Sequence, residues 1–541
     1  MIGLALLDGS QITLGLKTKI RFKRRNPLFY NDVIPVDFSF PFSLPVKGNE
    51  DLFEFVHLPQ SASRIFKVEI IITLNGNAWK RGMLEVNGEK KGDYECEFSG
   101  KTPEVLDGEV KLATLFTETI DGSLMENPLM ANFKTWPEAN VCYPSYINDD
   151  EYFLSLYKWK YVNRHENGGF VLTSAPDKVP LAVNLYLGYV LNESCRAMGF
   201  VAHGDLLLDT ELMTIFIWNN YIFQWNAGAW IAPETYLVPD ITINQFFLTL
   251  KKWLAIHIVI DFKRRIIHFN KMKYVRDKNQ VVDLNNKVGN VMPVTFNKAN
   301  GHRLSLSFAD EYNSGVTNKD AVEINGVYNY SGQLPSAGSV AIGDYVICTA
   351  DNAIYYIDEA LNHKIYGYLS NTVEKGEEDE SISVEAGPLT EFYDHPDVQG
   401  QLLPRINHLI RDTTQRNTFG LKLLFYRGMQ ESVTSPDLYP LASSYILAVQ
   451  VAVPNYVQVG NYSLHPNGDY GTYTVFWKEH IKWLQQAPEF EMELYLNNTD
   501  LENWDDRSLL SHRGVLYVYQ ELDVVVDTKG IVAVQCSVRK A

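Results

Sequence analysis

The sequence predicts a mainly β protein with a few helices, an α+β chain of several domains. The chain has 541 residues, which is too long for a single hydrophobic core. Aromatic residues make up 13% of it, with 31 Tyr and 27 Phe, and these residue types are enriched in strands. Short alternating segments bounded by turn residues recur along the chain, whereas only two segments show the apolar periodicity of an amphipathic helix.

Composition restricts the class of protein further. The net charge of −17 argues against a general nucleic-acid binder, which needs a basic surface. Residues 2–7 are apolar but too few for a signal peptide, and no run reaches the ~18 apolar residues of a membrane span. We therefore expect a soluble protein made in a cytoplasm. The chain has five cysteines: Cys96, Cys142, Cys195, Cys348 and Cys536. They are odd in number, scattered, and form no metal or redox motif, so we expect them to be small core residues in a reducing compartment.

Residues 36–49 are the stretch around which we expect the rest to be organised. Val36, Phe38, Phe40 and Phe42 alternate with small or polar residues, so one face of an extended segment would be strongly apolar. Prolines 41 and 45 cannot donate ladder hydrogen bonds, which predicts a sheet edge or a crossing loop. We expect Phe40 and Phe42 to be buried.

Residues 1–120 are predicted to be a compact β domain. Strands are expected at 64–74, 79–86 and 92–98, with a hairpin turn at Asn75-Gly76. A basic face precedes them on one strand, with cations at period two: Lys17, Lys19, Arg21 and Lys23. This face is either a docking surface for an acidic partner protein or an ordinary solvated strand face.

The middle of the chain divides into three predicted parts. Residues 121–235 are an aromatic-rich insertion, irregular or β. Residues 236–300 form a small α/β domain, in which a helix capped by Asp240 or Thr242 is followed by a hairpin. Residues 301–420 form a β domain with a strand at 302–308 and an acidic surface loop at 374–380.

The last predicted part, residues 421–541, is a β domain with one amphipathic helix. A strand is expected at 421–426, and the helix at 471–486 ends before Pro488. Strands at 490–496, 514–519 and 530–537 complete the chain.

A search for reactive motifs yields no site. Gly100-Lys101-Thr102 matches the end of a phosphate loop, but Glu95 stands where the first glycine belongs. Two groups of metal-friendly side chains have no second ligand pair and are expected to be surface loops: His203, Asp205, Asp209 and Glu211, and Asp394-His395-Pro396-Asp397. His257 and His268 lie in the predicted hairpin, where we expect them to face solvent. We therefore predict no catalytic residues, no cofactor and no metal.

Four segments resemble the hub proteins at the tail tips of phages, in particular those of Bacteroidetes phages and prophages. They follow in order from residue 36 to about residue 520: Phe40–Pro45 with Asn49; Pro239–Phe247 with Ile258–Asp261; Leu424–Gly428 with Tyr439–Ser443; and Ser463–Lys478 with Asp500-Leu501. Residues 121–235 match nothing in that family.

The resemblance implies a fold like that of tail-tube subunits. Such a hub is a homotrimer in which each subunit supplies two tube-like β-barrels, here within 1–120 and 421–541. The ring caps the tail tube and carries spike or receptor-binding parts. Its implied neighbours are the tail tube or distal-tail ring, the tape measure and a spike or receptor-binding protein, with DNA only in transit.

The resemblance places the chain at the tip of a virion tail and implies no enzymatic activity. Two alternatives stay open. One is a hexameric distal-tail ring protein. The other is a glycan-binding or glycan-cleaving tail β protein, because aromatic β proteins rich in acidic residues often bind glycans.

Overall fold

A computed structural model describes most of the chain. The described residues are 2–31, 34, 38–58, 60, 66–100, 106, 110–121, 134–148, 161–166, 169–170, 180–219, 221, 223–224, 231–261, 264–275, 280–295, 302–308, 324–328, 341, 343–348, 353–357, 363–368, 372–375, 378–384, 386–388, 392–394, 402–406, 420–431, 438–444, 446–452, 455–466 and 468–541. The fold is mainly β with a few helices and several sheets, which confirms the predicted fold class. The domain boundaries at 120, 235, 300 and 420 stay predictions.

A 14-stranded sheet contains both ends of the chain. Its strands are β1 (Ile2–Leu6), β2 (Gln11–Ile12), β3 (Lys19–Arg25), β4 (Phe38–Ser39), β5 (Phe42–Pro45), β6 (Phe66–Leu74), β7 (Asn77–Lys90), β8 (Asp93–Gly100), β23 (Val281–Asp283), β24 (Val288–Thr295), β39 (Glu489–Leu494), β40 (Leu509–His512), β41 (Val515–Asp527) and β42 (Gly530–Lys540). The main path runs β2-β1-β6-β7-β8-β4-β3-β41-β42-β39-β24. One continuous sheet therefore joins the first hundred residues to the last fifty.

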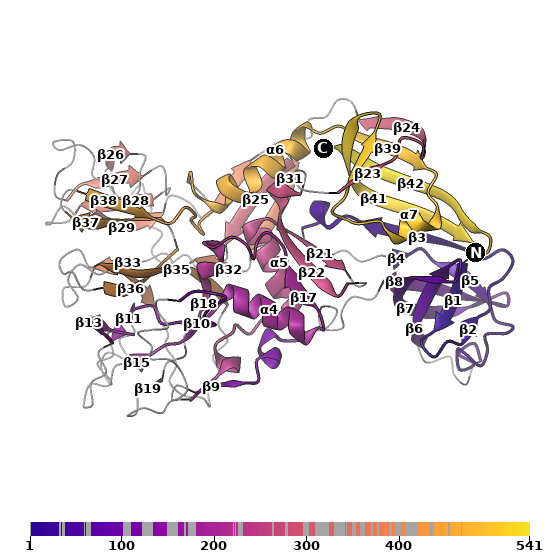
Figure 1. Ribbon diagram of the computed structural model, residues 1–541, viewed down its shortest axis with the longest axis horizontal. Helices are drawn as coiled ribbons and strands as arrows, with labels where there is room; N and C mark the ends of the chain where they lie inside the picture. Colours follow the sequence, from indigo (N-terminus) through magenta and orange to yellow (C-terminus); the bar gives the residue numbers. More distant parts are fainter. Residues whose placement is uncertain are drawn as a thin grey trace.

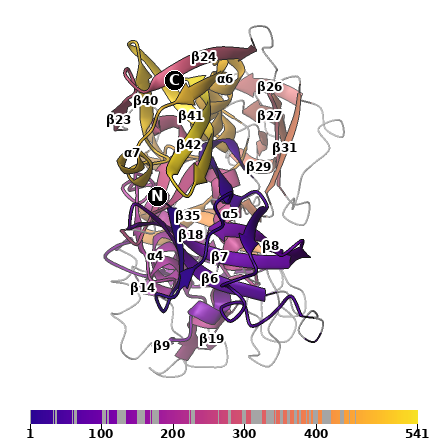
Figure 2. The same ribbon diagram turned by 90° about the vertical axis from the view of Figure 1, so that its right-hand side faces the viewer.

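We call strands β1–β8 the N-terminal unit, and strands β23, β24 and β39–β42 the C-terminal unit. The two units lie next to each other at one end of the molecule (Figure 1), and the view along that end shows β41 and β42 above β6 and β7 (Figure 2). Their inner faces share one hydrophobic core, to which both units contribute fully buried residues such as Leu84, Phe98 and Val538. Burial of this shared core stabilises the two units together.

A second hydrophobic core occupies the middle of the molecule. It is built on the sheet of β10 (Val141–Cys142), β16 (Asn184–Tyr186), β18 (Ile215–Trp218), β32 (Ala386–Pro388), β35 (Leu421–Glu431) and β36 (Leu438–Ser443), and on the sheet of β17 (Val201–His203), β21 (Ile256–Asp261) and β22 (Ile266–Lys271). The longer helices beside it are α4 (Leu187–Ala197), α5 (Ile243–Leu254) and α6 (Lys478–Gln486). This core is therefore of mixed α and β structure.

Smaller sheets make up the rest of the described chain. They contain β9 (Thr119–Asp121) with β20 (Ile231–Pro233), β13 (His165–Glu166) with β14 (Gly169–Phe170), β15 (Pro180–Leu181) with β19 (Phe223–Gln224), and β37 (Leu447–Ala452) with β38 (Asn455–Val459). Others contain β11 (Tyr146–Asn148), β12 (Tyr161–Val162), β33 (Phe392–Asp394) and β34 (Leu402–Ile406); β25 (His302–Phe308), β30 (Thr372–Lys375) and β31 (Glu378–Val384); and β26 (Ile324–Tyr328), β27 (Tyr345–Cys348), β28 (Ala353–Ile357) and β29 (His363–Tyr368).

The predicted helices are present at the expected places. Thr242, not Asp240, is the N-cap of α5, and its side chain forms a capping box with Gln245. The predicted helix 471–486 is a π-helical turn, Tyr473–Trp477, followed by α6. Helix α4 and the short α7 (Asn498–Glu502) were not predicted, although Leu187, Leu191 and Cys195 give α4 an apolar face.

The first predicted hairpin and the burial of four cysteines are confirmed. Asn75 and Gly76 have φ of 52° and 84° between β6 and β7, as a two-residue hairpin turn requires.

Cys96, Cys142, Cys195 and Cys536 are buried free thiols, and burial raises the pKa of Cys96 and Cys195 to about 12.

The segment 36–49 bears out the expected sheet edge in one strand and not in the other. Among the described strands β5 pairs only with β8, whereas β4 pairs with β3 on one side and β8 on the other. The face also changes along the segment: Ser39 and Phe42 are buried, whereas Phe38 and Phe40 are only half-buried. Pro41 falls in the gap between β4 and β5, where no ladder donor is needed and the alternation is interrupted.

Phe42 and Phe40 should therefore respond differently to truncation. We expect Phe42→Ala to lower the free energy of unfolding by ~3–5 kcal/mol, because it opens a cavity in the shared core. Phe40→Ala should cost about 1 kcal/mol or less, since it removes a partly exposed ring. Urea midpoints of the two variants measure the difference, and equal losses would contradict the assignment of the two rings to opposite faces.

Candidate functional site

The structural feature most relevant to assembly is the seam, by which we mean the ladder between β3 and β41. Seven residue pairs form it, from Lys19 opposite Asp527 to Arg25 opposite Glu521. The two strands run antiparallel, and residues on one face of each strand meet directly across the ladder. The seam therefore joins the N-terminal and C-terminal units by backbone hydrogen bonds.

The outer face of the seam pairs cations with acids. Arg21 forms an ion pair with Asp523, and both Lys23 and Arg25 reach Glu521. On the opposite face of β3, Arg24 contacts Asp506 at 2.7 Å. The acids that meet Arg21 and Lys23 thus belong to the C-terminal strand of the same chain, and not to the separate partner protein that one alternative expects. Lys17 and Lys19 are exposed, as the solvated alternative expects.

Two phenylalanines of β4 and its flank complete this face. The Arg21 guanidinium lies 4.5 Å from the centre of the Phe40 ring, and that of Arg25 lies 5.2 Å from the Phe38 ring. Such cation–π contacts are attractive even at partly exposed sites. The two rings are therefore covered by arginines rather than by the core, which explains why Phe40 is not fully buried.

Glu521 is the electrostatic centre of the seam. Burial alone would raise its pKa, but hydrogen bonds from Lys23 and the Tyr30 hydroxyl, together with the nearby positive charges, outweigh burial and lower it. The same contact, with burial as the larger cause, raises the pKa of Tyr30. Glu521 is therefore ionised in the folded protein at neutral pH.

A polar joint links the seam to the mixed core. Asn26 follows β3 directly, and its side chain donates to the carbonyl oxygen of Tyr519 at 2.9 Å. Its amide oxygen lies 3.2 Å from Nε2 of His257 on β21. The fully buried Lys251 of α5 donates to the carbonyl oxygen of Pro27 at 2.9 Å. Buried polar groups with such partners fix the position of one core relative to the other.

The expectation that His257 and His268 face solvent is wrong. Both are buried, since β21 and β22 pack inside the molecule. Burial, reinforced by Lys251, lowers the pKa of His257 to about 3, and burial beside Arg507 lowers the pKa of His268 to about 4. Both imidazoles are therefore neutral at pH 7.

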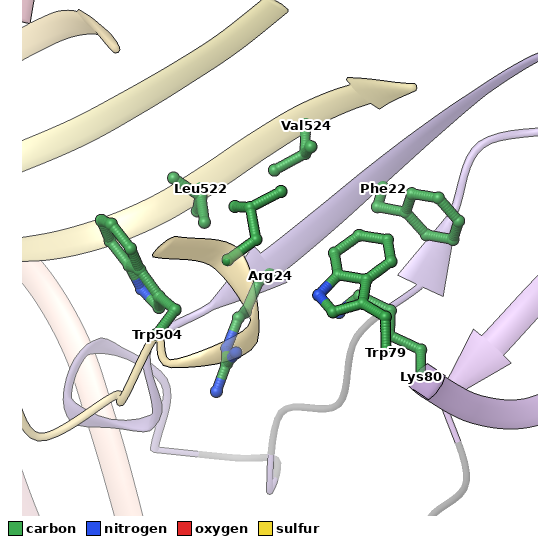
Figure 3. A pocket seen from close by; sticks show the side chains of 8 residues that line it. Phe22, Arg24, Trp79, Lys80, Trp504, Leu522 and Val524 are labelled. Carbon is green, nitrogen blue, oxygen red and sulfur yellow. The ribbon is translucent and has the colours of Figure 1, made fainter. Parts of the chain in front are cut away.

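A shallow pocket opens where the two units meet on the inner side of the sheet. It encloses about 250 Å³ of empty space that is partly open to solvent. Trp79 and Trp504 face it from the two units, Arg24 lies between them, and Leu522 and Val524 of β41 lie behind (Figure 3). The space left for a ligand is much smaller than this volume, because part of the volume is open solvent. We assign no cofactor to it.

Two of the four residues in the predicted metal-friendly group at 203–211 are counter-charges to buried cations. Asp209 forms an ion pair with Lys271, whose side chain is only 6% exposed. Glu211 binds Arg427 at 2.6 Å and also accepts from the backbone N–H of Asn461 at 2.8 Å. Each acid compensates a charge that would be costly to bury alone.

The other candidates are not assembled into a site either. Gly100 ends β8 and Asp394 ends β33, while residues 101–102 and 395–397 lie outside the described residues. Among the described residues, no group of three His, Cys, Asp or Glu side chains could hold a metal ion. The helices in the described part of the chain include none long and apolar enough to cross a membrane.

Sequence reasoning missed the acidic half of the seam and the polar joint. Glu521, Asp523 and Asp527 lie on the same face of one strand, which mirrors the spacing of cations in 19–25. That complementary pattern was a usable signal for the pairing. No comparable pattern marks Asn26 or Lys251, because a single buried polar residue has no periodicity.

No family model matches the sequence, and no curated protein is significantly similar to it. Several solved structures are similar over the whole chain. They include the 43 kDa tail protein of prophage MuSo2 from Shewanella oneidensis, with 8% identity and a TM-score of 0.34, which is covered over 98% of its length. A tail protein from Neisseria meningitidis has 6% identity, a TM-score of 0.27 and 96% coverage.

A further similar structure is a Francisella PdpA-VgrG complex in its half-lidded form, at 8% identity and a TM-score of 0.29. The similarity spans all of this chain and 57% of that one. At these identities and TM-scores the likenesses carry no argument about function.

The seam should respond to pH through Glu521. Its pKa is lowered on folding, so its stabilising contribution is present above the ordinary carboxyl pKa of about 4.5 and is lost as pH falls through the lowered value. We expect Glu521→Gln to lower the free energy of unfolding by about 1–2 kcal/mol at pH 7. Denaturation at pH 7 and pH 3 measures this, and the difference between variant and wild type should shrink at pH 3. An undiminished difference at pH 3 would mean that the loss is not electrostatic.

The polar joint should give a separate acid dependence. The pKa of His257 is lowered on folding, so the unfolded chain binds a proton between pH 6.5 and about 3 that the folded chain does not. Stability must therefore fall as pH decreases across this range, by up to about 1.4 kcal/mol per pH unit for one group. In His257→Gln this part of the slope should disappear, as measured by urea midpoints from pH 6.5 to 4. A slope equal to that of the wild type would contradict the buried neutral state.

Proposed function

We propose that this chain is a hub at the tip of a phage tail, where three copies form a ring that caps the tail tube. The observation that carries the proposal is the single sheet that joins two β units edge to edge through the seam. Two β units per chain are what the resemblance to tail-tip hubs implies. Three such chains present six units to a sixfold tube.

The seam suits a chain that must hold two units in one ring. Backbone ladder hydrogen bonds and three outer-face ion pairs fix how the C-terminal unit lies against the N-terminal unit. The shared apolar core behind the seam makes the two units fold as one body. Such a chain behaves as one third of a ring.

The proposed neighbours follow from that place in the particle. The ring would contact the tail tube or distal-tail ring on one side and a spike or receptor-binding protein on the other, with the tape measure and DNA in the lumen. The protein would be synthesised in the bacterial cytoplasm and reside in the virion at the tail tip. The mixed core and the smaller sheets would then face the peripheral components.

We also propose that the chain has no catalytic activity. Two of the acidic residues considered as metal ligands, Asp209 and Glu211, are engaged with Lys271 and Arg427. Steady release of reducing sugar from host polysaccharide by the purified chain would contradict this part of the proposal and favour a glycan-cleaving tail protein.

The assembly state tests the proposal directly. We expect a mass of three chains for the purified protein, by light scattering at micromolar concentration. We also expect a label on the C-terminus to appear at the tail tip in electron micrographs of particles. Six copies in one ring would support a distal-tail ring protein instead, and a label distributed along the tail would exclude both.

A further inference from the structure

The pocket between the two units is lined by hydrogen-bond donors and by apolar side chains. Four of the lining side chains are polar: Arg24, Trp79, Lys80 and Trp504. Each of these four donates hydrogen bonds and none accepts them, and two of them are cations. The described residues that line the pocket include no Asp or Glu. The wall therefore suits an anion that brings its own acceptor atoms.

A β-bulge brings two neighbouring side chains to the pocket. Lys80 of β7 is paired with Ile72 of β6, and the next pair joins Ala78 to Thr73. Trp79 therefore has no partner in this ladder. Adjacent side chains of a regular strand point to opposite faces, whereas the extra residue of a bulge re-aims its side chain. Trp79 and Lys80 thus both line the pocket (Figure 3), with the Lys80 ammonium 4.5 Å from the centre of the Trp79 ring.

Arg24 is a charged residue on the face of β3 that otherwise enters the shared core. Ile20 and Phe22 on the same face are buried, whereas the Arg24 side chain is 26% exposed. Its Nε donates to Asp506 at 2.7 Å, and the Tyr519 hydroxyl donates to the same carboxylate. Asp506 therefore holds the Arg24 guanidinium beside the pocket and offsets one of the two cations there.

Trp504 supplies a donor that the folded chain leaves without an acceptor. The residue is only 8% exposed, and its ring packs edge-on against Tyr519 with 5.4 Å between the ring centres. The buried indole Nε1 has no hydrogen-bond partner among the described residues. A buried donor without an acceptor costs free energy. An acceptor atom that enters the pocket would remove part of this cost.

We propose that this pocket binds the carboxylate of an acidic side chain that projects from a partner protein. The two cations and the indole N–H groups meet the carboxylate oxygens, and the apolar wall meets the methylene groups next to them. Because part of the pocket volume is open solvent, only a few atoms are enclosed and the rest of the partner stays outside. That size fits the end of one side chain. The binding site does not depend on the proposed trimer, because all of its residues belong to one chain.

The pocket is complete only where the two units meet. Arg24 and Lys80 lie on strands of the N-terminal unit, whereas Leu522 lies on β41 and Trp504 lies between α7 and β40. Tryptophan and arginine are also the residue types most enriched among the strongest contacts of protein interfaces. A partner that binds here therefore recognises the paired sheet and neither unit alone.

The test uses the full chain and two tripeptides with capped ends, one with a central glutamate and one with a central glutamine. The caps leave the glutamate side chain as the only carboxylate. We expect the glutamate peptide to bind at millimolar concentration in saturation-transfer NMR, and the glutamine peptide, which has nearly the same shape and no charge, not to bind.

Single variants assign the binding to the pocket. Lys80→Gln should weaken binding of the glutamate peptide roughly tenfold, and Trp504→Phe, which keeps a ring and removes the N–H, roughly threefold. Lys90→Gln is the matched control and should leave binding unchanged, because Lys90 lies on the same strand, has a side chain that is 71% exposed and does not line the pocket. Melting temperatures show whether each variant is folded.

Carbodiimide coupling locates the peptide on the wild-type chain, independently of any variant. A water-soluble carbodiimide activates the peptide carboxylate, and a lysine amine beside it displaces the urea and forms an amide. We expect the amide on Lys80 in preference to Lys90, although Lys80 is partly buried and Lys90 is exposed. Peptide mapping by mass spectrometry measures the two yields.

Three results would overturn the carboxylate site. One is that the two tripeptides bind alike or that neither binds to the wild-type chain. Another is that the folded Lys80→Gln variant binds the glutamate peptide as tightly as the wild type does. The third is that coupling follows exposure, with Lys90 modified more than Lys80. None of these results bears on the trimer, whose mass is measured separately.

Discussion

The fold depends on the pairing of β3 with β41, which brings Arg21 to Asp523 across 502 positions of sequence. Closing so long a loop costs conformational entropy. The hydrogen bonds of the ladder and the burial of the shared core offset this cost only when they form together. Neither unit therefore completes its part of the sheet until both ends of the chain are present. Between β8 and β39, the described strands outside β23 and β24 belong to other sheets.

The seam also explains how charge is distributed in the chain. A sequence with net charge −17 concentrates basic residues on β3, where they neutralise acids of β41. Opposite charges directly across an antiparallel ladder favour the correct register and disfavour a one-residue slip, which would place them on opposite faces. The ion pairs are partly exposed, so their value lies more in specifying this register than in raw stability.

The local parts of the fold could be predicted from the sequence, and the long-range parts could not. The turn at Asn75-Gly76 and the cap at Thr242 depend on neighbouring residues, so their chemistry is visible in a short window. The buried His257 has its hydrogen-bond partner in Asn26, which is distant in sequence, and the half-burial of Phe40 depends on an arginine from another strand. The interior position of β4 was missed for the same reason, because prolines at its flank were taken to exclude pairing on both sides.

A continuous sheet has a mechanical consequence for the two units. Adjacent strands are rotated by roughly −20° to −25° relative to each other, so strand twist sets the angle between the units across β4, β3 and β41. Hinge motion there would break ladder hydrogen bonds in a region whose inner face is fully buried at Phe22 and Leu522. The joint to the mixed core combines polar contacts around Asn26 and Lys251 with apolar packing, since Leu509 of β40 and Val518 of β41 are buried in the mixed core. The sheet should therefore move as one rigid body, without a hinge between its two units.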